Sequence, residues 1–252
     1  MTQSIALITG GSRGLGRNAA LHLARQGVGV VITYLSRSDE AAAVVTEIEA
    51  LGGKAAALQL DAGDTTQFAG FADQLAGTLQ SLWGRSTLDY LVNNAGMGLG
   101  ASFAETTEAQ FDALMNVHLK GVFFLTQRLL PLIADGGRIL NLSSGLARFS
   151  LPGHAAYASM KGAVEVLTRY LAKELGPRGI AVNVIAPGAI ETDFGGGAVR
   201  DNPDVNAFVA GNTAMGRAGL PDDIGGAIAS ILLGDNQWMT AQRIEVSGGM
   251  YL

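Results

Sequence analysis

Tyr157 and Lys161 are separated by three residues, so on a helix their side chains share one face. A free phenol has a pKa of about 10 and is a poor base at neutral pH, but a neighbouring ammonium group favours the phenolate. Ser144 lies thirteen residues before Tyr157, directly after an apolar run, and its hydroxyl could bond a substrate oxygen. A Tyr–Lys pair alone is common on exposed helix faces, and Ser144 makes the set specific. The three residues predict proton transfer at an oxygen atom of a substrate.

A glycine-rich turn near the start of the chain could bind a phosphate group. The apolar run Ile5–Thr9 leads directly into Gly10, Gly14 and Gly16, and a segment with helical periodicity follows. Glycine allows a tight turn and a close approach of the backbone, and the start of a helix offers free N–H groups to an anion. The turn by itself is weak evidence, but the strand–turn–helix context predicts a dinucleotide site.

Seven short apolar runs alternate with longer segments of helical period, and these elements must position the residues above. Continuous apolar strands joined by helices predict a parallel sheet covered on both faces, because each crossover between parallel strands needs a helix. We expect one α/β domain over residues 1–252, a Rossmann fold with a doubly wound, seven-stranded parallel sheet. The expected strands are Ile5–Thr9, Gly29–Tyr34, Ala55–Leu60, Leu88–Asn93, Arg138–Ser143, Ala181–Ile185 and Arg243–Val246. The expected helices are Leu15–Gln26, Asp39–Leu51, Thr65–Leu82, Glu108–Leu130, Ala155–Leu175 and Asp222–Leu233.

One segment, residues 189–220, interrupts this alternation. It contains three consecutive glycines, Gly195 to Gly197, together with Pro203 and scattered polar residues, and it shows neither a strand nor a convincing long helix. A connection of this length in a compact domain is usually functional or mobile. It follows an expected strand, beside the crevice where such sheets bind ligands, so we expect a substrate loop. The alternative is a surface insertion.

Composition narrows the classes of protein. The chain has 252 residues, of which 48% are hydrophobic and 15% charged, and these values are typical of a globular protein. The absence of cysteine excludes disulfides and thiolate chemistry. A net charge of −5 argues weakly against nucleic acid or an anionic membrane as partner. Neither a signal peptide nor a membrane span is visible, so a cytoplasmic location is expected.

The turn and the catalytic candidates resemble the short-chain dehydrogenase/reductase family. The spacing of Gly10, Gly14 and Gly16 differs from the common G-x-G-x-x-G and is similar to that family's fingerprint. The resemblance extends along nearly the whole chain. The further matches, in the family's order, are Asn93-Asn94-Ala95-Gly96, Asn116, Ser144, Tyr157, Lys161, Pro187-Gly188 and Thr192.

The resemblance implies a role for each catalytic candidate. Tyr157 would be the general acid and base, and Lys161 would activate it and bind the cofactor ribose. Ser144 would polarise the substrate oxygen, and Asn116 would hold a water molecule that links Lys161 to a proton relay. Ser143, the neighbour most easily confused with Ser144, is expected to point away.

The resemblance also implies the contacts of the cofactor. Asp61 would meet the adenine amino group, although it could serve only as a helix cap. Asn93 and Ala95 would line the adenosine side, and Ile190 and Thr192 would meet the nicotinamide carboxamide. The complete expected cofactor site is Gly10, Ser12, Arg13, Gly14, Leu15, Gly16, Tyr34, Ser36, Arg37, Asp61, Asn93, Ala95, Gly96, Tyr157, Lys161, Pro187, Gly188, Ile190 and Thr192.

The choice between NADP and NAD depends on the end of the second expected strand. An acid there would bind a ribose 2′-hydroxyl and repel a 2′-phosphate, but this chain has Tyr34. Arg13 and Arg37 could pair with a phosphate dianion, with Ser36 donating a hydrogen bond. Alternatively both arginines are solvated surface charges, and Leu35 stands where many NADP-linked relatives have arginine. The sequence favours NADP(H) as cofactor.

The expected activity is the interconversion of a ketone and a secondary alcohol, with a small carbonyl compound as substrate. One alternative is a 3-oxoacyl-[acyl-carrier-protein] reductase, whose relatives use a basic surface after the fifth helix. Here residues 133–137 contain Asp135, although Arg138 and Arg178 are near. A second alternative is a non-catalytic NADP-binding sensor on the same fold. The resemblance and the apolar face of Ala155–Leu175 imply a homotetramer.

Several other residues are expected to have structural roles rather than catalytic ones. No metal site is expected, because the three histidines are scattered. His22 and His118 are assigned to helix faces, and His154 to a solvated position near Tyr157. The pocket-wall candidates are Met97, Phe149 and Leu151. The departures from the family pattern near the end of the chain are Ala241, in place of the usual glycine, and Ser247, in place of the usual aspartate.

Overall fold

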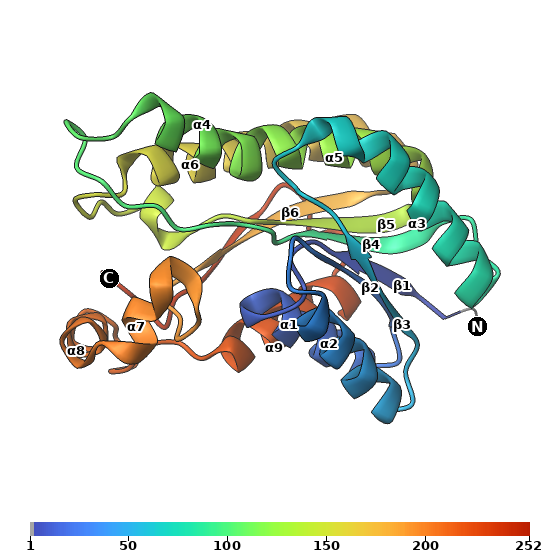
Figure 1. The fold of residues 1–252 in the computed structure, drawn as a ribbon, viewed down its shortest axis with the longest axis horizontal. Coiled ribbons are helices and arrows are strands. Elements are labelled where there is room, and N and C mark those ends of the chain that lie inside the picture. Colours follow the sequence, from blue (N-terminus) through green and yellow to red (C-terminus); the bar gives the residue numbers. More distant parts are fainter. Residues whose placement is uncertain (1–2) are drawn as a thin grey trace.

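The computed structural model describes residues 3–252, and a parallel sheet of seven strands runs through its centre (Figure 1). The strand order is β3-β2-β1-β4-β5-β6-β7, so the chain builds outward from β1 in one direction and from β4 in the other. This order confirms the predicted doubly wound α/β fold. The strands are β1 (Ile5–Ile8), β2 (Gly29–Tyr34), β3 (Ala55–Gln59), β4 (Leu88–Asn93), β5 (Ile133–Leu142), β6 (Ala181–Pro187) and β7 (Arg243–Val246).

Helices cover both faces of the sheet (Figure 1). One layer contains α1, α2 and α9, and the other contains α3 to α6. The helices are α1 (Gly14–Arg25), α2 (Ser38–Ala50), α3 (Phe68–Trp83), α4 (Glu108–Met115), α5 (Gly121–Leu129), α6 (Ala155–Leu175), α7 (Ala198–Asp201), α8 (Pro203–Gly211) and α9 (Pro221–Leu233). Within residues 3–252, no helix is both long and apolar enough to cross a membrane.

The two helical layers enclose two hydrophobic cores. Along β1, Ala6 and Ile8 face the core beneath α1 and α9, while Ile5 and Leu7 face the core beneath α3 and α5. Alternate residues of a strand point to opposite faces, so a strand buried on both sides must be apolar throughout. This is why the sequence shows continuous apolar runs rather than alternating ones.

The expected helix Glu108–Leu130 is divided by a wider turn. A π-helical turn, η2 (Asn116–Lys120), lies between α4 and α5, and its Gly121 N–H donates to the Asn116 carbonyl oxygen. A Cβ placed on Gly121 would overlap the carbonyl oxygen of Ala62, so the helix packs directly on the backbone that follows β3. The periodicity of the sequence did not show this turn, because a π turn inserts one residue without breaking the helix.

Strand β5 begins five residues earlier than the predicted start at Arg138. Its register against β4 shifts between Leu88 and Tyr90, and Gly136 has a φ of +76°. The Asp135–Gly137 stretch, which resembles a turn in the sequence, is therefore an irregularity within the strand.

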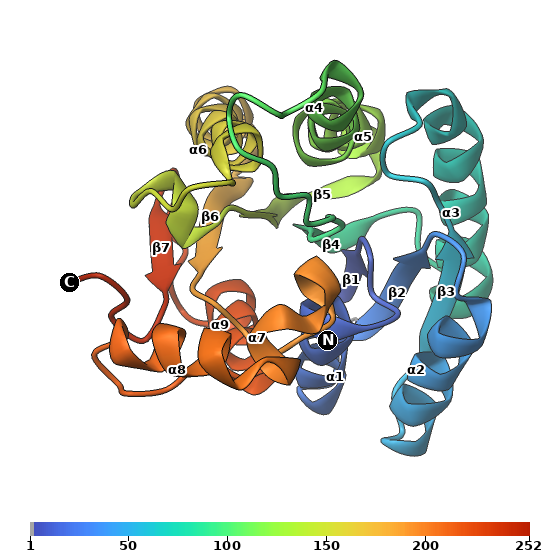
Figure 2. The same ribbon diagram turned by 60° about the vertical axis from the view of Figure 1, so that its left-hand side comes forward.

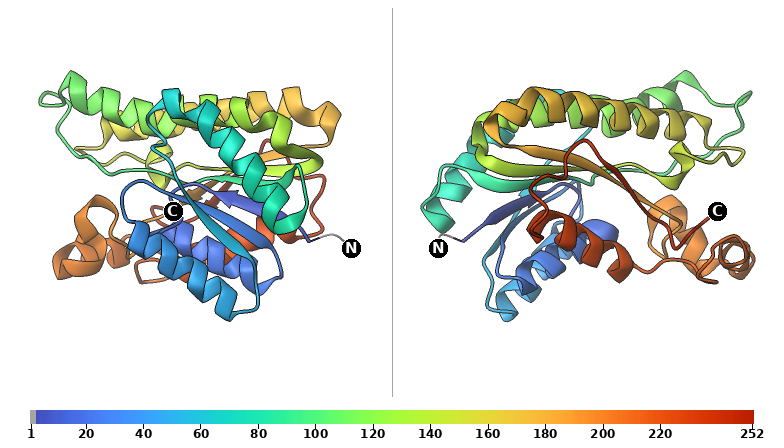
Figure 3. Two further views of the ribbon diagram at one scale, coloured as in Figure 1. Left: turned by 45° about the vertical axis from the view of Figure 1, so that its right-hand side comes forward. Right: turned by 180° about the vertical axis from the view of Figure 1, so that it is seen from behind.

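The segment of residues 189–220 projects from the carboxyl end of the sheet, and its helices α7 and α8 stand apart from both layers in Figure 1 and come to the front in Figure 2. The segment holds no long helix, as predicted, but the short helix α8 of nine residues was not expected. Asn202 caps it by accepting hydrogen bonds from two backbone N–H groups, and Pro203 occupies its first turn. The C-terminal residues lie beside the end of α8, where Thr213 pairs with Met250 (Figure 3).

Candidate functional site

The candidate residues meet at the carboxyl ends of four strands. Gly10 follows β1, Asn94 follows β4, Ser144 follows β5, and Gly188 follows β6. Strands β1 and β4 are neighbours in the sheet, although the chain leaves them toward opposite sides. Open α/β sheets bind ligands at such a reversal of strand order.

The turn after β1 is shaped by glycines that have no room for a side chain. Gly10 has a φ of +65°, and a Cβ on it would lie 2.9 Å from the Ala95 Cα atom. A Cβ on Gly16 would collide with the carbonyl oxygen of Gly10. Gly14 also has a positive φ, yet nothing lies closer to its Cβ position than Thr192, at 3.8 Å. The first turn of α1 carries no acidic residue, so its free N–H groups can donate hydrogen bonds to a bound anion.

Thr9 and Asn94 hold this turn against β4, and neither was among the expected site residues. The Thr9 hydroxyl accepts hydrogen bonds from the backbone N–H groups of Asn94 and Ala95, at 3.0 and 2.9 Å. The Asn94 side chain donates to the carbonyl oxygens of Thr9 and Gly10. The signals in the sequence were the place of Thr9 directly before the glycine turn and that of Asn94 within the family's Asn-Asn-Ala-Gly match.

The side chain of Asn93 belongs to a buried polar ladder. It donates to Thr126 Oγ1 at 3.0 Å and to Asn141 Oδ1 at 2.8 Å, and Asn141 in turn donates to Thr168. All four side chains are at most 3% exposed. Only the backbone of Asn93 is therefore left to line an adenosine site.

Of the two arginines expected at a 2′-phosphate, Arg37 follows β2 and Arg13 is the N-cap of α1, and both are paired with acids of the chain. Arg37 Nη2 lies 2.6 Å from Glu40 Oε1. Arg13 Nη1 lies 4.0 Å from Asp193 in the loop after β6. Both arginines are about half exposed, so these pairs are weak and can exchange for another anion. Asp61 Oδ1 accepts from the N–H of Gly63, which closes a local turn.

Tyr157, Lys161 and Ser144 come together, as the sequence predicted. Tyr157 is 8% exposed and Lys161 is 5% exposed, both on α6. Lys161 Nζ donates to the Leu142 carbonyl oxygen at 2.8 Å and lies 5.6 Å from the centre of the Tyr157 ring. The Ser144 side chain lies beside the Tyr157 hydroxyl, and its Oγ accepts from the Leu146 N–H.

Burial controls the ionisation of this set. It raises the pKa of Tyr157 to about 12, and the hydrogen bond with Ser144 only partly opposes this. It lowers the pKa of Lys161 to about 7. Both shifts favour the uncharged group, as desolvation requires. The phenol is therefore protonated at neutral pH, in the form that can donate a proton.

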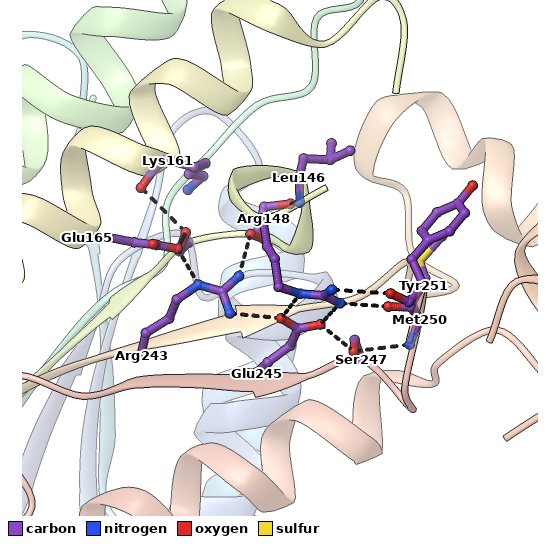
Figure 4. A network of polar contacts seen from close by, with 11 residues as sticks. Leu146, Arg148, Lys161, Glu165, Arg243, Glu245, Ser247, Met250 and Tyr251 are labelled. Atoms are coloured by element: carbon purple, nitrogen blue, oxygen red, sulfur yellow. Dashed lines mark hydrogen bonds and ion pairs between the residues drawn. The ribbon is translucent and has the colours of Figure 1, made fainter. Parts of the chain in front are cut away.

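A polar network fixes the backbone around Ser144 and Lys161 (Figure 4). Ser143 donates to Glu165 Oε1 at 2.6 Å and to the Lys161 carbonyl oxygen at 3.4 Å, so its hydroxyl lies against α6. Arg243 donates to Glu165 at 2.7 Å and to the Ser144 carbonyl oxygen at 3.3 Å. One arginine on β7 thus ties the serine to the helix that carries Tyr157.

The network continues to the C-terminal residues. Arg148 binds both carboxylate oxygens of Glu245, at 2.6 and 2.7 Å, and also donates to the carbonyl oxygens of Met250 and Tyr251 (Figure 4). The hydroxyl of Ser247 donates to Glu245. The serine that replaces the family's usual aspartate thus belongs to this network.

Asn116 and His118 lie on the π turn between α4 and α5. The helix-face interpretation of His118 was wrong: the residue is 1% exposed and lies edge-on to the Tyr157 ring. The wider turn and its packing decide this, and neither is visible in the sequence. Among residues 3–252, no three His, Asp or Glu side chains lie together in a group that could hold a metal ion.

The loop after β6 lies over Tyr157. The ring of Phe194 is 5.8 Å from that of Tyr157, and the Thr192 hydroxyl accepts from the Phe194 N–H. Met97 packs in the same apolar cluster as Tyr157. Phe149, another expected wall residue, instead stacks on Tyr251 at 4.8 Å.

A phosphate-type turn and a buried Tyr–Lys–Ser set at one edge of a doubly wound sheet define a Rossmann-fold oxidoreductase site. A family model described as enoyl-(acyl carrier protein) reductase matches residues 10–251. The chain belongs to the short-chain dehydrogenase/reductase family, as the resemblance implied.

Three relatives show the range of this similarity. The chain is 36% identical over 255 residues to a 3-oxoacyl-[acyl-carrier-protein] reductase of Staphylococcus aureus, covering 100% of this chain and 99% of that protein. It is 39% identical to the promiscuous reductase LugOII, which catalyses keto-reduction at C1 during lugdunomycin biosynthesis, with a TM-score of 0.94 and coverage of 100% and 99%. It is 36% identical to the angucycline C-6 ketoreductase LanV, solved with bound NADP, with a TM-score of 0.94 and coverage of 99% and 96%.

Proposed function

We propose that this chain is an NADP(H)-dependent ketone reductase in which Tyr157 donates the proton. The observation that carries the proposal is the buried Tyr157 phenol, protonated at neutral pH with Ser144 beside its hydroxyl. A developing alkoxide needs this proton donor. Lys161 Nζ lies 5.6 Å from the centre of the ring, and the π turn presents Asn116 as the proposed start of a proton relay.

The turn after β1 fits the pyrophosphate of a dinucleotide. Its free N–H groups, its open Gly14 and its lack of an acid all favour an anion. The bound nicotinamide would supply the hydride. Arg13 and Arg37 would exchange their exposed carboxylate partners for a 2′-phosphate, which carries more charge and accepts several hydrogen bonds. The NADP bound in the structure of LanV supports this choice.

We propose a ketone on an apolar skeleton as substrate. The side chains that pack around Tyr157 are apolar, including Met97, Leu146 and Leu114, and Phe194 faces the phenol ring. A small recess adjoins them, lined by Leu99, Leu114 and Ala156 among others, with a cavity volume of about 10 Å³. The activity named for LugOII and LanV, keto-reduction, agrees with these apolar surroundings.

A 3-oxoacyl carrier-protein thioester is the second candidate, because of the Staphylococcus aureus relative. The two arginines expected near the carrier's docking surface are occupied by contacts within the chain. Arg178 donates to Asp135 and to two carbonyl oxygens, and Arg138 donates to the carbonyl oxygens of Ile231 and Gly234. Because both arginines are hydrogen-bonded within the chain, they are less able to bind an acidic carrier protein, which favours a ketone that is not attached to a carrier.

Steady-state reduction with NADPH and NADH tests the proposal, using aryl ketones, a 3-oxoester and an acyl-carrier thioester. We expect turnover of an aryl ketone with NADPH that disappears in Tyr157→Phe. Turnover of the thioester alone would select the second candidate. Tight NADPH binding with no turnover of any substrate would indicate a sensor.

We also propose that the chain forms a homotetramer. Phe123 and Phe124 on α5, together with Val166 and Tyr170 on α6, are exposed on neighbouring helices of one layer. Exposed apolar side chains gathered on one face commonly mark an interface. Light scattering after gel filtration measures the oligomer, and Tyr170→Glu should weaken it.

A further inference from the structure

His118 is a buried imidazole that connects two parts of the site. Its Nε2 lies 2.8 Å from the carbonyl oxygen of Met97, in the loop that follows β4. Its ring meets the Tyr157 ring edge-on, with centres 5.1 Å apart and planes at 90°. One side chain therefore contacts both the loop beside the cofactor turn and the proton donor.

The surroundings of His118 keep it uncharged. Burial, followed by the nearby charge of Lys161, lowers its pKa to about 3. Nε2 lies 2.8 Å from the carbonyl oxygen of Met97 and 3.2 Å from its backbone nitrogen, and the shorter contact is made by the tautomer that donates from Nε2. In that tautomer Nδ1 is a bare acceptor, buried with no hydrogen-bond partner among residues 3–252. A buried acceptor without a hydrogen bond destabilises the folded state, so a histidine at position 118 lowers the stability of the fold.

The backbone is shaped around this ring. A Cβ on Gly96 would lie 2.8 Å from His118 Cε1, so only glycine allows the loop to approach the imidazole so closely. The π turn that begins at Asn116 turns His118 inward, toward α6. Sequence and helix geometry both accommodate this one side chain.

We propose that His118 is a positioning residue, which holds the Tyr157 ring through its edge and the Met97 wall of the substrate pocket through its Nε2–H. The proposal rests on the proposed function, because it assigns Tyr157 as the proton donor. Edge-to-face packing restricts the tilt of the phenol, and the hydrogen bond restricts the wall that the substrate meets.

Two substitutions separate these contacts. His118→Phe keeps a ring beside Tyr157 and loses the donor to Met97, whereas His118→Gln keeps an amide donor and loses the ring. For His118→Phe we expect KM for the ketone to rise about fivefold with kcat within about twofold of wild type. For His118→Gln we expect kcat to fall about fivefold to tenfold with little change in KM. Leu125→Ala, buried in α5 outside the Tyr157 cluster, measures what a loss of stability alone does.

The ionisation of Tyr157 gives a readout without turnover. Absorbance titration of tyrosinate, with Tyr157→Phe subtracted, follows this phenol, whose ring contacts two titratable groups, Lys161 and His118. In His118→Gln water reaches the ring edge, so the pKa of Tyr157 should fall, and in His118→Phe it should stay. Equal kcat and KM changes in both variants, matching Leu125→Ala, would overturn the proposal. Wild-type ionisation of Tyr157 in His118→Gln would overturn it too. Loss of turnover in Tyr157→Phe tests the proposed function separately.

Discussion

The side of the site beside β1 is formed mainly by backbone atoms, and the side beside β5 mainly by side chains. Beside β1 the site is made of backbone: Gly10 and Gly16 approach their neighbours so closely that a single carbon atom does not fit. Beside β5 it is made of side chains, with Ser144 and Lys161 held by hydrogen bonds from residues distant in the sequence. The β1 side depends on the absence of side chains at Gly10 and Gly16, and the β5 side depends on the functional groups that its side chains carry.

This difference predicts opposite sensitivities. Adding one methyl group should damage the β1 side, because a close-packed backbone cannot yield. Removing one oxygen or one charge should damage the β5 side while leaving its shape unchanged. The predictions below test this contrast.

The largest effect should come from one oxygen atom on the β5 side. Tyr157→Phe removes the proposed proton donor and keeps the ring, so kcat should fall by about a thousandfold while the Kd for NADPH changes little. Tyr170→Phe, on the same helix and 65% exposed, is the matched control and should keep full activity. Substantial turnover in Tyr157→Phe would show that another group supplies the proton.

On the β1 side, Gly16→Ala should destabilise the fold by about 2–3 kcal/mol, because the new methyl group collides with the Gly10 carbonyl. Gly77→Ala, inside α3 with nothing within 4 Å, is the control and should raise stability by about 0.5–1 kcal/mol. Urea unfolding measures both. Equal stability of the two variants would contradict the close packing of the turn.

The charged network behind Ser144 should show a dependence on pH. Hydrogen bonds from Arg148, followed by those from Arg243 and Ser247, lower the pKa of Glu245 to about 2. The folded chain therefore keeps this carboxylate ionised. Its stabilisation is present above the unfolded pKa of about 4.3 and is lost as the pH falls toward the folded value.

Glu245→Gln should accordingly cost about 2 kcal/mol at pH 7, and this difference from wild type should shrink as the pH falls from about 4 toward 2. Urea unfolding at several pH values measures it. The exposed Glu49→Gln is the control, with a change within about 0.5 kcal/mol. A difference that stays constant with pH would mean that Arg148 does not stabilise the ionised form.

The smallest effect concerns the two side chains that extend the β1 side. Arg13→Gln and Arg37→Gln should each lower kcat/KM for NADPH by about tenfold and leave NADH within about twofold. Arg25→Gln, exposed at the far end of α1, should change neither value. A parallel loss with NADH would show that these arginines do not read a 2′-phosphate.

Most elements were predictable because their signals are local. The alternation of apolar runs and helical periods predicted all seven strands, and Ala155–Leu175 has its predicted bounds. The prediction placed the start of β5 too late, because Gly136 and Gly137 resemble a turn. It also missed α8, whose cap at Asn202 lies in a stretch of glycine, proline and polar residues.

By itself the sequence determined the fold class, the family and the list of residues that could do chemistry. These depend on the spacing and order of residues along the chain, which the sequence contains in full. Only the tertiary structure decided which of these residues is buried, what each contacts, and in which direction each pKa moves. Asn93 bonds Asn141 across neighbouring strands, and His118 meets Tyr157 across two helices. Desolvation depends on every segment that packs around a group, and those segments are distant in the sequence.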